Sequence, residues 1–225
     1  MGQSIAFRCP DGSTCEGYLA EVADAAVAAD AAVGIVVLQE WWGLNDQIRG
    51  TAERFAAAGF TALAPDLYQG RVTTDPDEAS HLMTGLDWPG ACAVEVRGAL
   101  QHLKAKLPKA AVSGFCMGGA LAVIAAAKLP ECDAAVSFYG IPPEDQAHPA
   151  DMKVPFQGHF AKADEWCTPE AVDRLEAALA LASIPWEIHR YGAAHGFFNE
   201  TIEAYDAAAC EHSWARTLDF LAKHL

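Results

Sequence analysis

Short apolar runs alternate along the chain with longer segments whose apolar residues recur at helical spacing. The apolar runs have the length of strands: Val33–Leu38, Phe60–Ala64, Ala110–Ser113, Ala134–Tyr139, Val154–Phe160 and Trp186–Tyr191. The segments between them predict helices: Asn45–Ala58, Pro89–Lys106, Gly119–Lys128, Pro169–Leu181 and Tyr205–His224. Strands that are apolar throughout and alternate with helices are typical of a parallel sheet covered on both faces.

Residues at the ends of these segments support the boundaries. Asn45 or Asp46 can cap the first predicted helix, and Gly59 follows it as a C-terminal stop. Thr168–Pro169 has the form of an N-cap followed by a proline at the first helical position. Near the N-terminus, an Asp11–Gly12 pair between β-prone residues predicts a short antiparallel hairpin at the edge of the sheet.

The pattern therefore predicts an α/β fold in a single domain over residues 1–225. We expect a mostly parallel central sheet, helices on both of its faces and an antiparallel hairpin at the N-terminal edge. The alanine-rich run over residues 20–32 is interpreted as a loop or edge segment and not as a domain boundary. Ligand sites in such sheets form at the carboxyl ends of the strands, which is where candidate residues are sought.

Composition and charge exclude several classes of function. Of the 225 residues, 52% are hydrophobic and 20% charged, which excludes a disordered chain. Thirty acidic residues stand against fifteen basic ones, for a formal net charge of −15, and the basic residues form no cluster. Such a chain repels a phosphate backbone and an anionic membrane surface. We expect it to bind neither nucleic acid nor a membrane.

Three features bear on the compartment. The N-terminus lacks the basic start and long apolar stretch of a secretory signal. The uncharged stretch between Lys109 and Lys128 is interrupted by glycines, so it predicts a buried strand, a turn and a buried helix in place of a membrane span. The seven cysteines are scattered, with no CxxC pair, which indicates neither a disulfide framework nor a zinc site and favours a reducing compartment. We expect a soluble, cytoplasmic protein in which six cysteines are small buried hydrophobic residues.

The seventh cysteine lies in a motif of its own. Gly114–Gly118, with the sequence GFCMG, follows a predicted strand and precedes a predicted helix, as in the nucleophile elbow G-x-S-x-G with cysteine in place of serine. The glycines let strand and helix approach around a strained nucleophile. The N–H of Met117, at the helix start, would face the oxygen of a bound acyl group, and the helix end would lower the pKa of Cys116. The alternative is a glycine-rich turn around an inert thiol.

A nucleophile of this kind needs a base and an acid that orients the base. In folds with this elbow the acid follows the nucleophile in the chain and the histidine comes last. Asp164 lies just past the end of a predicted strand, with Glu165 beside it as an alternative. His195 lies in a glycine-flanked loop past the last predicted strand. His159 and His189 fall within strands, and we interpret them as structural residues.

One more acid lies at the same rim of the predicted sheet. The strand Val33–Leu38 runs into Glu40, which Trp41 and Trp42 follow. Two tryptophans beside a carboxylate would remove water from it and raise its pKa. In enzymes with this elbow, the loop after the corresponding strand supplies a second N–H to the oxyanion hole, here that of Trp41. The alternative for Glu40 is a solvated loop acid.

Together these residues resemble the dienelactone hydrolase family of the α/β-hydrolase superfamily. The resemblance spans nearly the whole chain and rests on four segments: QEWWG (39–43), APDLY (64–68), GFCMGG (114–119) and AHGFFN (194–199). It implies the α/β-hydrolase fold, a Cys116–His195–Asp164 triad and an oxyanion hole of the Trp41 and Met117 N–H groups. It also implies that Glu40 pairs with the resting thiol and helps to deprotonate it when substrate arrives.

The chain departs from that family where substrate is bound. The family's dienelactone hydrolases hold a substrate carboxylate with arginines, one of them four residues after the catalytic histidine, where this chain has Asn199. A neutral amide cannot make the charge-assisted clamp of an arginine. Arg71 is a candidate for the other basic contact. Aromatic residues are candidates for lining an apolar pocket: Trp41, Trp42, Trp88, Phe138, Phe197 and Phe198.

The expected function is hydrolysis of a carboxylic ester or lactone through a covalent thioacyl intermediate, as the resemblance to carboxymethylenebutenolidase implies. The departures favour a neutral or weakly charged small-molecule substrate over a dienelactone. We expect a monomer or small homo-oligomer. The sequence contains no phosphate loop, dinucleotide fingerprint or metal-ligand cluster, so we expect no cofactor and no metal. The alternative is a redox-sensing or non-catalytic protein of this fold with a reactive Cys116.

Overall fold

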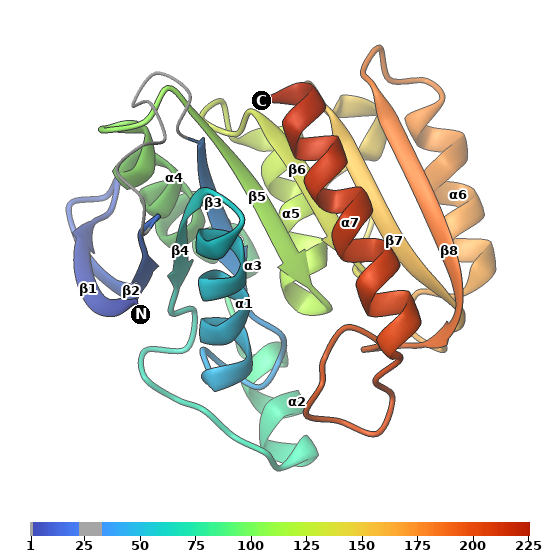
Figure 1. Cartoon of the computed structure of the whole chain (residues 1–225), viewed down its shortest axis with the longest axis horizontal. Helices are drawn as coiled ribbons and strands as arrows, with labels where there is room; N and C mark the ends of the chain where they lie inside the picture. The colour runs from blue at the N-terminus through green and yellow to red at the C-terminus, as the bar shows by residue number, and fades with distance from the viewer. Residues whose placement is uncertain (1, 23–32) are drawn as a thin grey trace.

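A computed structural model describes residues 2–22 and 33–225, and one eight-stranded sheet runs through them in the order β1-β2-β4-β3-β5-β6-β7-β8 (Figure 1). The strands are β1 (Gln3–Arg8), β2 (Thr14–Ala20), β3 (Val33–Leu38), β4 (Phe60–Pro65), β5 (Lys109–Phe115), β6 (Ala134–Phe138), β7 (Phe156–Ala163) and β8 (Trp186–Ala194). Strands β3 to β8 pair in parallel, whereas β2 runs antiparallel to β4 and forms an antiparallel hairpin with β1. The predicted mostly parallel sheet with an antiparallel edge hairpin is confirmed.

Helices cover both faces of this sheet. Figure 1 shows α1 (Asp46–Ala57) and α7 (Ala207–His224) on one face, with α4 (Arg97–Lys104), α5 (Met117–Lys128) and α6 (Pro169–Leu179) on the other. Strand β3 shows why the strands are apolar throughout. Ile35 and Val37 pack into the core under α1 and α7, whereas Val36 and Leu38 pack into the core under α4, α5 and α6. Successive side chains of a strand point to opposite faces, and here both faces are buried.

Most helix boundaries follow the local signals. The Asn45 side chain accepts a hydrogen bond from the Ile48 N–H at the start of α1, and Thr168 caps α6 in the same way. Gly59 follows α1 with a φ of 99°, in the left-handed region that favours glycine. The segment predicted as one helix over Pro89–Lys106 divides into α3 (Trp88–Ala91), a π-helical turn (Cys92–Val96) and α4.

Helix α2 (Pro76–Thr84) was not predicted from the sequence. Asp75 caps it and Pro76 begins it, but only Ala79 and Leu82 are buried, so it carries too few apolar residues to show a helical period. The predicted loop or edge segment over residues 20–32 begins at the last residue of β2, and its residues 23–32 lie outside the described residues. No helix among the described residues combines the length and apolar character needed to cross a bilayer.

Cys9 and Cys15 form a disulfide bridge, so the expectation that all cysteines other than the nucleophile are unpaired filler is wrong for this pair. The hairpin register places Phe7 opposite Cys15, and the Cys9 N–H donates to the Ser13 carbonyl. These contacts bring the two Cα atoms to 6.2 Å, within disulfide range. A disulfide does not favour a reducing compartment. Four cysteines are free and buried, as expected: Cys92, Cys132, Cys167 and Cys210.

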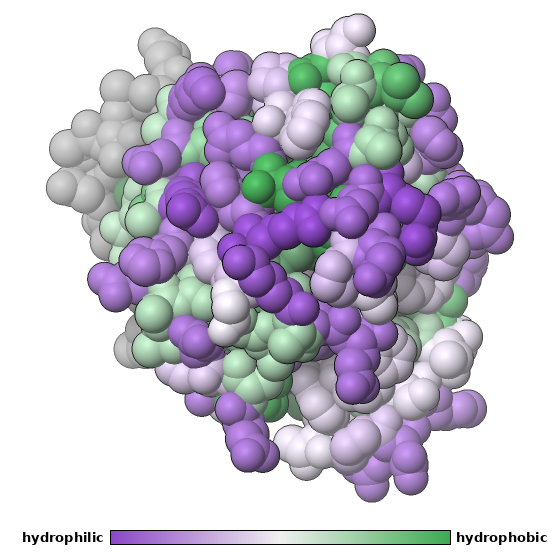
Figure 2. All heavy atoms as spheres, turned by 90° about the vertical axis from the view of Figure 1, so that its right-hand side faces the viewer, coloured by the Kyte–Doolittle hydropathy of each residue, from purple (hydrophilic) through white to green (hydrophobic). Residues whose placement is uncertain are grey.

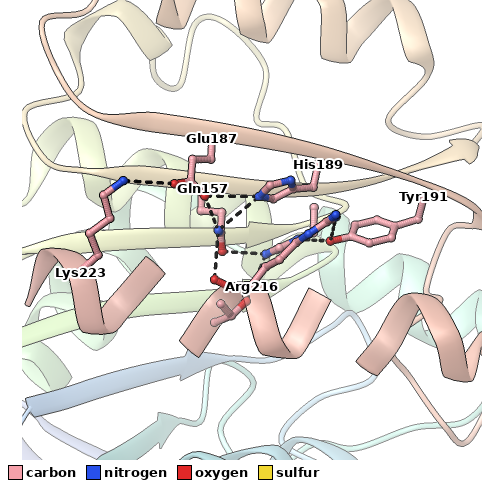
Figure 3. Close-up of polar contacts among 8 residues, drawn as sticks. Gln157, Glu187, His189, Tyr191, Arg216 and Lys223 are labelled. Atoms are coloured by element: carbon pink, nitrogen blue, oxygen red, sulfur yellow. Dashed lines mark hydrogen bonds and ion pairs between the residues drawn. The ribbon is translucent and has the colours of Figure 1, made fainter. Parts of the chain in front are cut away.

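A polar network ties α7 to strands β7 and β8 (Figure 3). His159 is fully buried, with Nδ1 2.8 Å from the Tyr191 hydroxyl and Nε2 2.9 Å from Gln157 Oε1. Arg216 Nη1 donates to the Tyr191 hydroxyl at 3.2 Å, and the Thr217 hydroxyl lies 3.1 Å from His159 Nε2. The interpretation of His159 as a structural residue is confirmed. Figure 2 shows the side of the molecule beyond β8, where hydrophilic residues predominate, which discourages pairing with a further strand.

Candidate active site

The carboxyl ends of five strands carry the candidate residues. Glu40 follows β3, Cys116 follows β5, Tyr139 follows β6, Asp164 follows β7 and His195 follows β8. This end of the sheet is the lower one in Figure 1, where α2 and the loop before α7 lie. Strand β3 pairs with β4 on one side and β5 on the other, so the order of the strands reverses between β3 and β5. Ligands bind at such a switch point in open α/β sheets.

Cys116 has the backbone conformation of a nucleophile elbow, with a φ of 55° and a ψ of −116°. It is the single residue between β5 and α5, and its N–H donates to the Phe138 carbonyl at 3.0 Å. A Cβ on Gly114 would overlap the Gly118 carbonyl, and one on Gly118 would overlap the Leu38 carbonyl. Both glycines are therefore required for the strand and helix to approach this closely. A positive φ at a non-glycine residue is strained and is held by these contacts.

The half-buried His195 forms a hydrogen bond with the buried Asp164. His195 Nδ1 lies 2.9 Å from Asp164 Oδ2, and Asp164 Oδ1 accepts the N–H groups of Trp166 at 2.8 Å and Cys167 at 2.9 Å. Burial alone would raise the pKa of the Asp164 carboxyl, but His195 and the two N–H groups hold that pKa below its ordinary value. Glu165, the alternative acid, is exposed.

Glu40 is buried and both of its carboxylate oxygens accept a hydrogen bond. The Tyr139 hydroxyl donates to Oε1 at 2.9 Å, and Asn199 Nδ2 donates to Oε2 at 2.7 Å. Asn199 Oδ1 accepts from the N–H and hydroxyl of Thr201, which orients the amide toward Glu40. Burial raises the pKa of Glu40 although both hydrogen bonds oppose the shift, and this is the direction that the flanking tryptophans predict.

The pKa of the Cys116 thiol is raised, so the predicted lowering is wrong. Burial raises this pKa most, and the charge of Glu40 raises it further, whereas the Met117 N–H lowers it. One N–H at the start of a helix lowers the pKa of the thiol by less than the loss of water and a neighbouring carboxylate raise it. Within the described residues no hydrogen bond joins the Cys116 sulfur to His195. The resting thiol is therefore protonated.

Cys116, Glu40 and His195 line one cavity of about 120 Å³. Apart from these three, its walls are apolar: Trp41, Trp42, Met83, Trp166, Gly196 and Ile202. The Trp166 ring lies 6.1 Å from the ring of Trp41 and 6.4 Å from that of His195, measured between centroids. The cavity thus places a thiol, a histidine and a carboxylate between mainly apolar walls.

The two predicted oxyanion donors lie at the start of α5 and in the turn after β3. Neither the Met117 N–H nor the Trp41 N–H donates to a backbone acceptor within the described chain. The first N–H groups of a helix have no acceptor in the helix itself, so the Met117 N–H has no acceptor within α5.

The predicted substrate-binding residues do not line this cavity. Arg71 is exposed and lines a separate hollow beside Asp87 and Glu95, so it presents no charge to Cys116. Asn199 is fully buried, and its amide is used on Glu40.

Of the aromatic residues predicted to line the pocket, Trp41 and Trp42 line the cavity and the others do not. Trp88 donates its indole N–H to the Met83 carbonyl at 3.3 Å behind the cavity wall. Phe138 is fully buried and stacks on the ring of His159 at 4.6 Å, and Phe197 is fully buried as well. Their apolar surface is used in the core.

Four residues around the cavity were missed by the sequence analysis: Tyr139, Met83, Trp166 and Ile202. Position is a usable signal for two of them, because Tyr139 directly follows β6 and Trp166 comes two residues after Asp164. Met83 comes from the helix that was not predicted, and Ile202 comes from the loop before α7. Neither carries a local signal.

Comparisons with known proteins identify the family and the fold. A sequence model of the dienelactone hydrolase family matches residues 16–225. Protein usf of Aquifex pyrophilus is 31% identical over 237 residues, covering all of both chains. Carboxymethylenebutenolidase 1 of Cupriavidus pinatubonensis is 31% identical over 210 residues, covering 86% of this chain and 87% of its own. A solved dienelactone hydrolase-like promiscuous phosphotriesterase from metagenomic libraries has a TM-score of 0.83 at 24% identity, covering 99% of this chain and 98% of that one.

Proposed function

The chain belongs to the dienelactone hydrolase family of ester hydrolases, and we propose that it cleaves carboxylic esters and lactones through a Cys116–His195–Asp164 triad and a thioacyl intermediate. One observation carries this proposal. A cysteine in a strained elbow and a histidine held by a buried aspartate line the same small cavity. Nucleophile, base and orienting acid are the groups that covalent acyl transfer needs.

The reaction proceeds in two halves. The Cys116 sulfur attacks the ester carbonyl while the Trp41 and Met117 N–H groups donate to the developing oxyanion. The thiol proton passes through the Glu40 carboxylate to His195, which returns it to the departing alkoxide, so the first half yields a thioester and an alcohol. His195 then takes a proton from water, and the water oxygen attacks the thioester carbonyl. The C–S bond breaks, the carboxylic acid leaves, and His195 returns the proton to the Cys116 sulfur. Asp164 holds the histidine ring and stabilises its charged form.

Activation of the thiol needs Glu40, because the resting thiol is protonated. Its carboxylate lines the cavity beside Cys116 and raises the pKa of the thiol through its charge. When a substrate excludes the remaining water, this carboxylate assists removal of the thiol proton. A thiolate then forms only in the presence of substrate.

The cavity favours a neutral substrate. Among the described residues, no lysine or arginine lines it, and Glu40 is the acid in its wall. Asn199, the sequence candidate for contacting a substrate carboxylate, is hydrogen-bonded to that acid. A substrate carboxylate would lose its hydration there without gaining a partner. We therefore propose uncharged esters and lactones as substrates in preference to a carboxylate-bearing dienelactone.

Hydrolysis of p-nitrophenyl acetate by the wild type, Cys116→Ala and Cys132→Ala tests the proposal. We expect Cys116→Ala to lose turnover and Cys132→Ala, which alters a buried free cysteine outside the cavity, to retain it. Intact-protein mass spectrometry after rapid quenching should show one added acyl group on the wild type and none on Cys116→Ala. Undiminished turnover by Cys116→Ala would overturn the proposal.

The redox-sensing alternative has less support. A sensor cysteine is oxidised as its thiolate, and burial raises the pKa of Cys116 and keeps the thiol protonated. A sensor also has no use for the His195–Asp164 pair. Loss of one thiol equivalent to peroxide without any ester turnover would favour the alternative.

A further inference from the structure

The backbone and the side chain of Trp166 contact different parts of the site. Its backbone N–H holds Asp164 Oδ1 at 2.8 Å, whereas its indole lines the cavity and is 67% exposed. The exposed large hydrophobic residues of the described chain are Val72, Trp166, Leu181 and Tyr205, and Trp166 is the one among them that lines the cavity. Most of the indole surface at this cavity mouth is in contact with water. A ligand that covered it would gain binding free energy by removing apolar surface from water.

The proposed reaction places the alcohol part of the substrate beside Trp166. During acylation His195 must reach the oxygen of the departing alcohol, so the alcohol part lies on the His195 side of the carbonyl carbon. The carbonyl carbon itself is bonded to Cys116, and the carbonyl oxygen faces the Met117 N–H. The Trp166 ring lies 6.4 Å from the His195 ring, so it borders the route by which the alcohol leaves.

On the cavity side, the groups next to Trp166 are aromatic. The Trp166 ring meets Trp41 edge-on at 6.1 Å, and Trp41 meets Trp42 edge-on at 5.0 Å. On this side no lysine or arginine lies among the described residues that line the cavity, whereas the other side of Trp166 borders a separate hollow whose walls include Glu144, His148 and Arg174. An aromatic ring packs on an aromatic surface through offset or edge-to-face contact, which a saturated ring of similar size cannot reproduce.

We propose that Trp166 forms an alcohol-side subsite that selects esters whose alcohol part carries an uncharged aromatic ring. This inference rests on the proposed function and adds to it the class of alcohol. It makes Trp166 a specificity-determining residue whose indole contacts the substrate while its backbone holds the triad acid.

Benzyl acetate and cyclohexylmethyl acetate form the matched substrate pair, because their alcohols have similar acidity and size and differ in the flat aromatic ring. For the wild type we expect kcat/KM for the benzyl ester to exceed that for the cyclohexylmethyl ester by about threefold to tenfold. Trp166→Leu, which keeps an apolar side chain, should bring this ratio close to one, whereas Trp166→Phe should keep most of it. Damage to the triad would lower both rates together and leave the ratio unchanged.

Leu181→Ala is the matched control, because Leu181 is 76% exposed and lies outside the cavity. Its ratio should equal that of the wild type. A ratio near one in the wild type, or a ratio that survives Trp166→Leu, would overturn the inference. Those results leave the proposed function standing as long as turnover depends on Cys116. Turnover that persists in Cys116→Ala would instead overturn the proposed function.

Discussion

Asn199 Nδ2 donates a hydrogen bond of 2.7 Å to Glu40 Oε2, although 159 residues separate the two in the chain. The resemblance to dienelactone hydrolases assigns this position to an arginine that binds a substrate carboxylate, whereas the amide of Asn199 is turned toward the buried acid. Glu40 therefore has both oxygens satisfied before any ligand arrives. The same contact removes Asn199 from substrate binding and makes it part of the support of Glu40.

Replacement of Asn199 by aspartate should raise the pKa of Glu40, because a second carboxylate would face the first. Since Glu40 acts as a base in the proposed reaction, the acid limb of kcat/KM against pH should move to higher pH by about one unit or more. The measurement is a pH profile for a neutral ester. An acid limb at the wild-type position would show that Glu40 is not the group that titrates there.

Tyr139→Phe should move the same limb in the same direction. The Tyr139 hydroxyl donates to Glu40 Oε1 and thereby lowers the pKa of Glu40, so its removal should raise that pKa. The substitution keeps the ring, whose centroid lies 4.9 Å from that of His195. The free energy of unfolding should fall by about 1–3 kcal/mol, because a buried acceptor loses a donor. Tyr191→Phe is the control, since Tyr191 bonds to His159 and Arg216 and should leave the limb unchanged.

Asp164→Asn should lower kcat by about 10³–10⁴-fold, because an amide facing His195 Nδ1 favours the wrong tautomer of the ring. The neighbouring Glu165→Gln changes an exposed acid and should leave kcat within about twofold of the wild type. Rates are measured with saturating p-nitrophenyl acetate. If Glu165→Gln lost activity and Asp164→Asn kept it, the assignment of the orienting acid would be reversed.

The free energy of unfolding should fall in weak acid, because His159 binds a proton more readily in the unfolded chain than in the folded one. Burial first, then His189 and Arg216, hold the pKa of His159 well below its ordinary 6.5. The unfolded chain therefore binds a proton that the folded chain does not. The free energy of unfolding is at its full value above about pH 6.5 and decreases as the pH falls below it, by up to about 1.4 kcal/mol per pH unit.

Urea unfolding at pH 7.5 and pH 5.5 measures this difference. His102, His189 and His224 also have lowered pKa values and contribute in the same direction, so a variant must isolate His159. His159→Gln should reduce the loss between the two pH values, whereas the exposed His212→Gln should not. Equal losses in His159→Gln and the wild type would contradict the prediction.

Gly118→Ala should destabilise the fold by about 2–3 kcal/mol, because its Cβ would overlap the carbonyl groups of Leu38 and Gln39. Gly50→Ala is the matched control. Gly50 lies in the middle of α1 with nothing within 4 Å of an added Cβ, and alanine there should stabilise by about 0.5–1 kcal/mol. Chemical unfolding of both variants measures the contrast, and a loss in Gly50→Ala equal to that in Gly118→Ala would refute the elbow argument.

The candidate triad could be named from the sequence because each member carries a local signal. Cys116 lies in a glycine motif between an apolar strand and a helix, Asp164 directly follows a strand, and His195 follows another. Carboxyl ends of parallel strands meet at one edge, so local pattern was sufficient to bring the three together. The Cys9–Cys15 bridge, the Asn199–Glu40 contact and the cavity wall carried no such signal.

By itself, then, the sequence determined the α/β class, the mostly parallel sheet and which residues stand at its carboxyl edge, because these depend on hydrophobic periodicity and turn residues that act over a few positions. Tertiary structure alone decided the partners of Glu40, the wall that Met83 and Trp166 form, and the direction of the shift in the pKa of Cys116. Those properties depend on how much water is removed and on charges brought together from distant segments, and no local pattern records either.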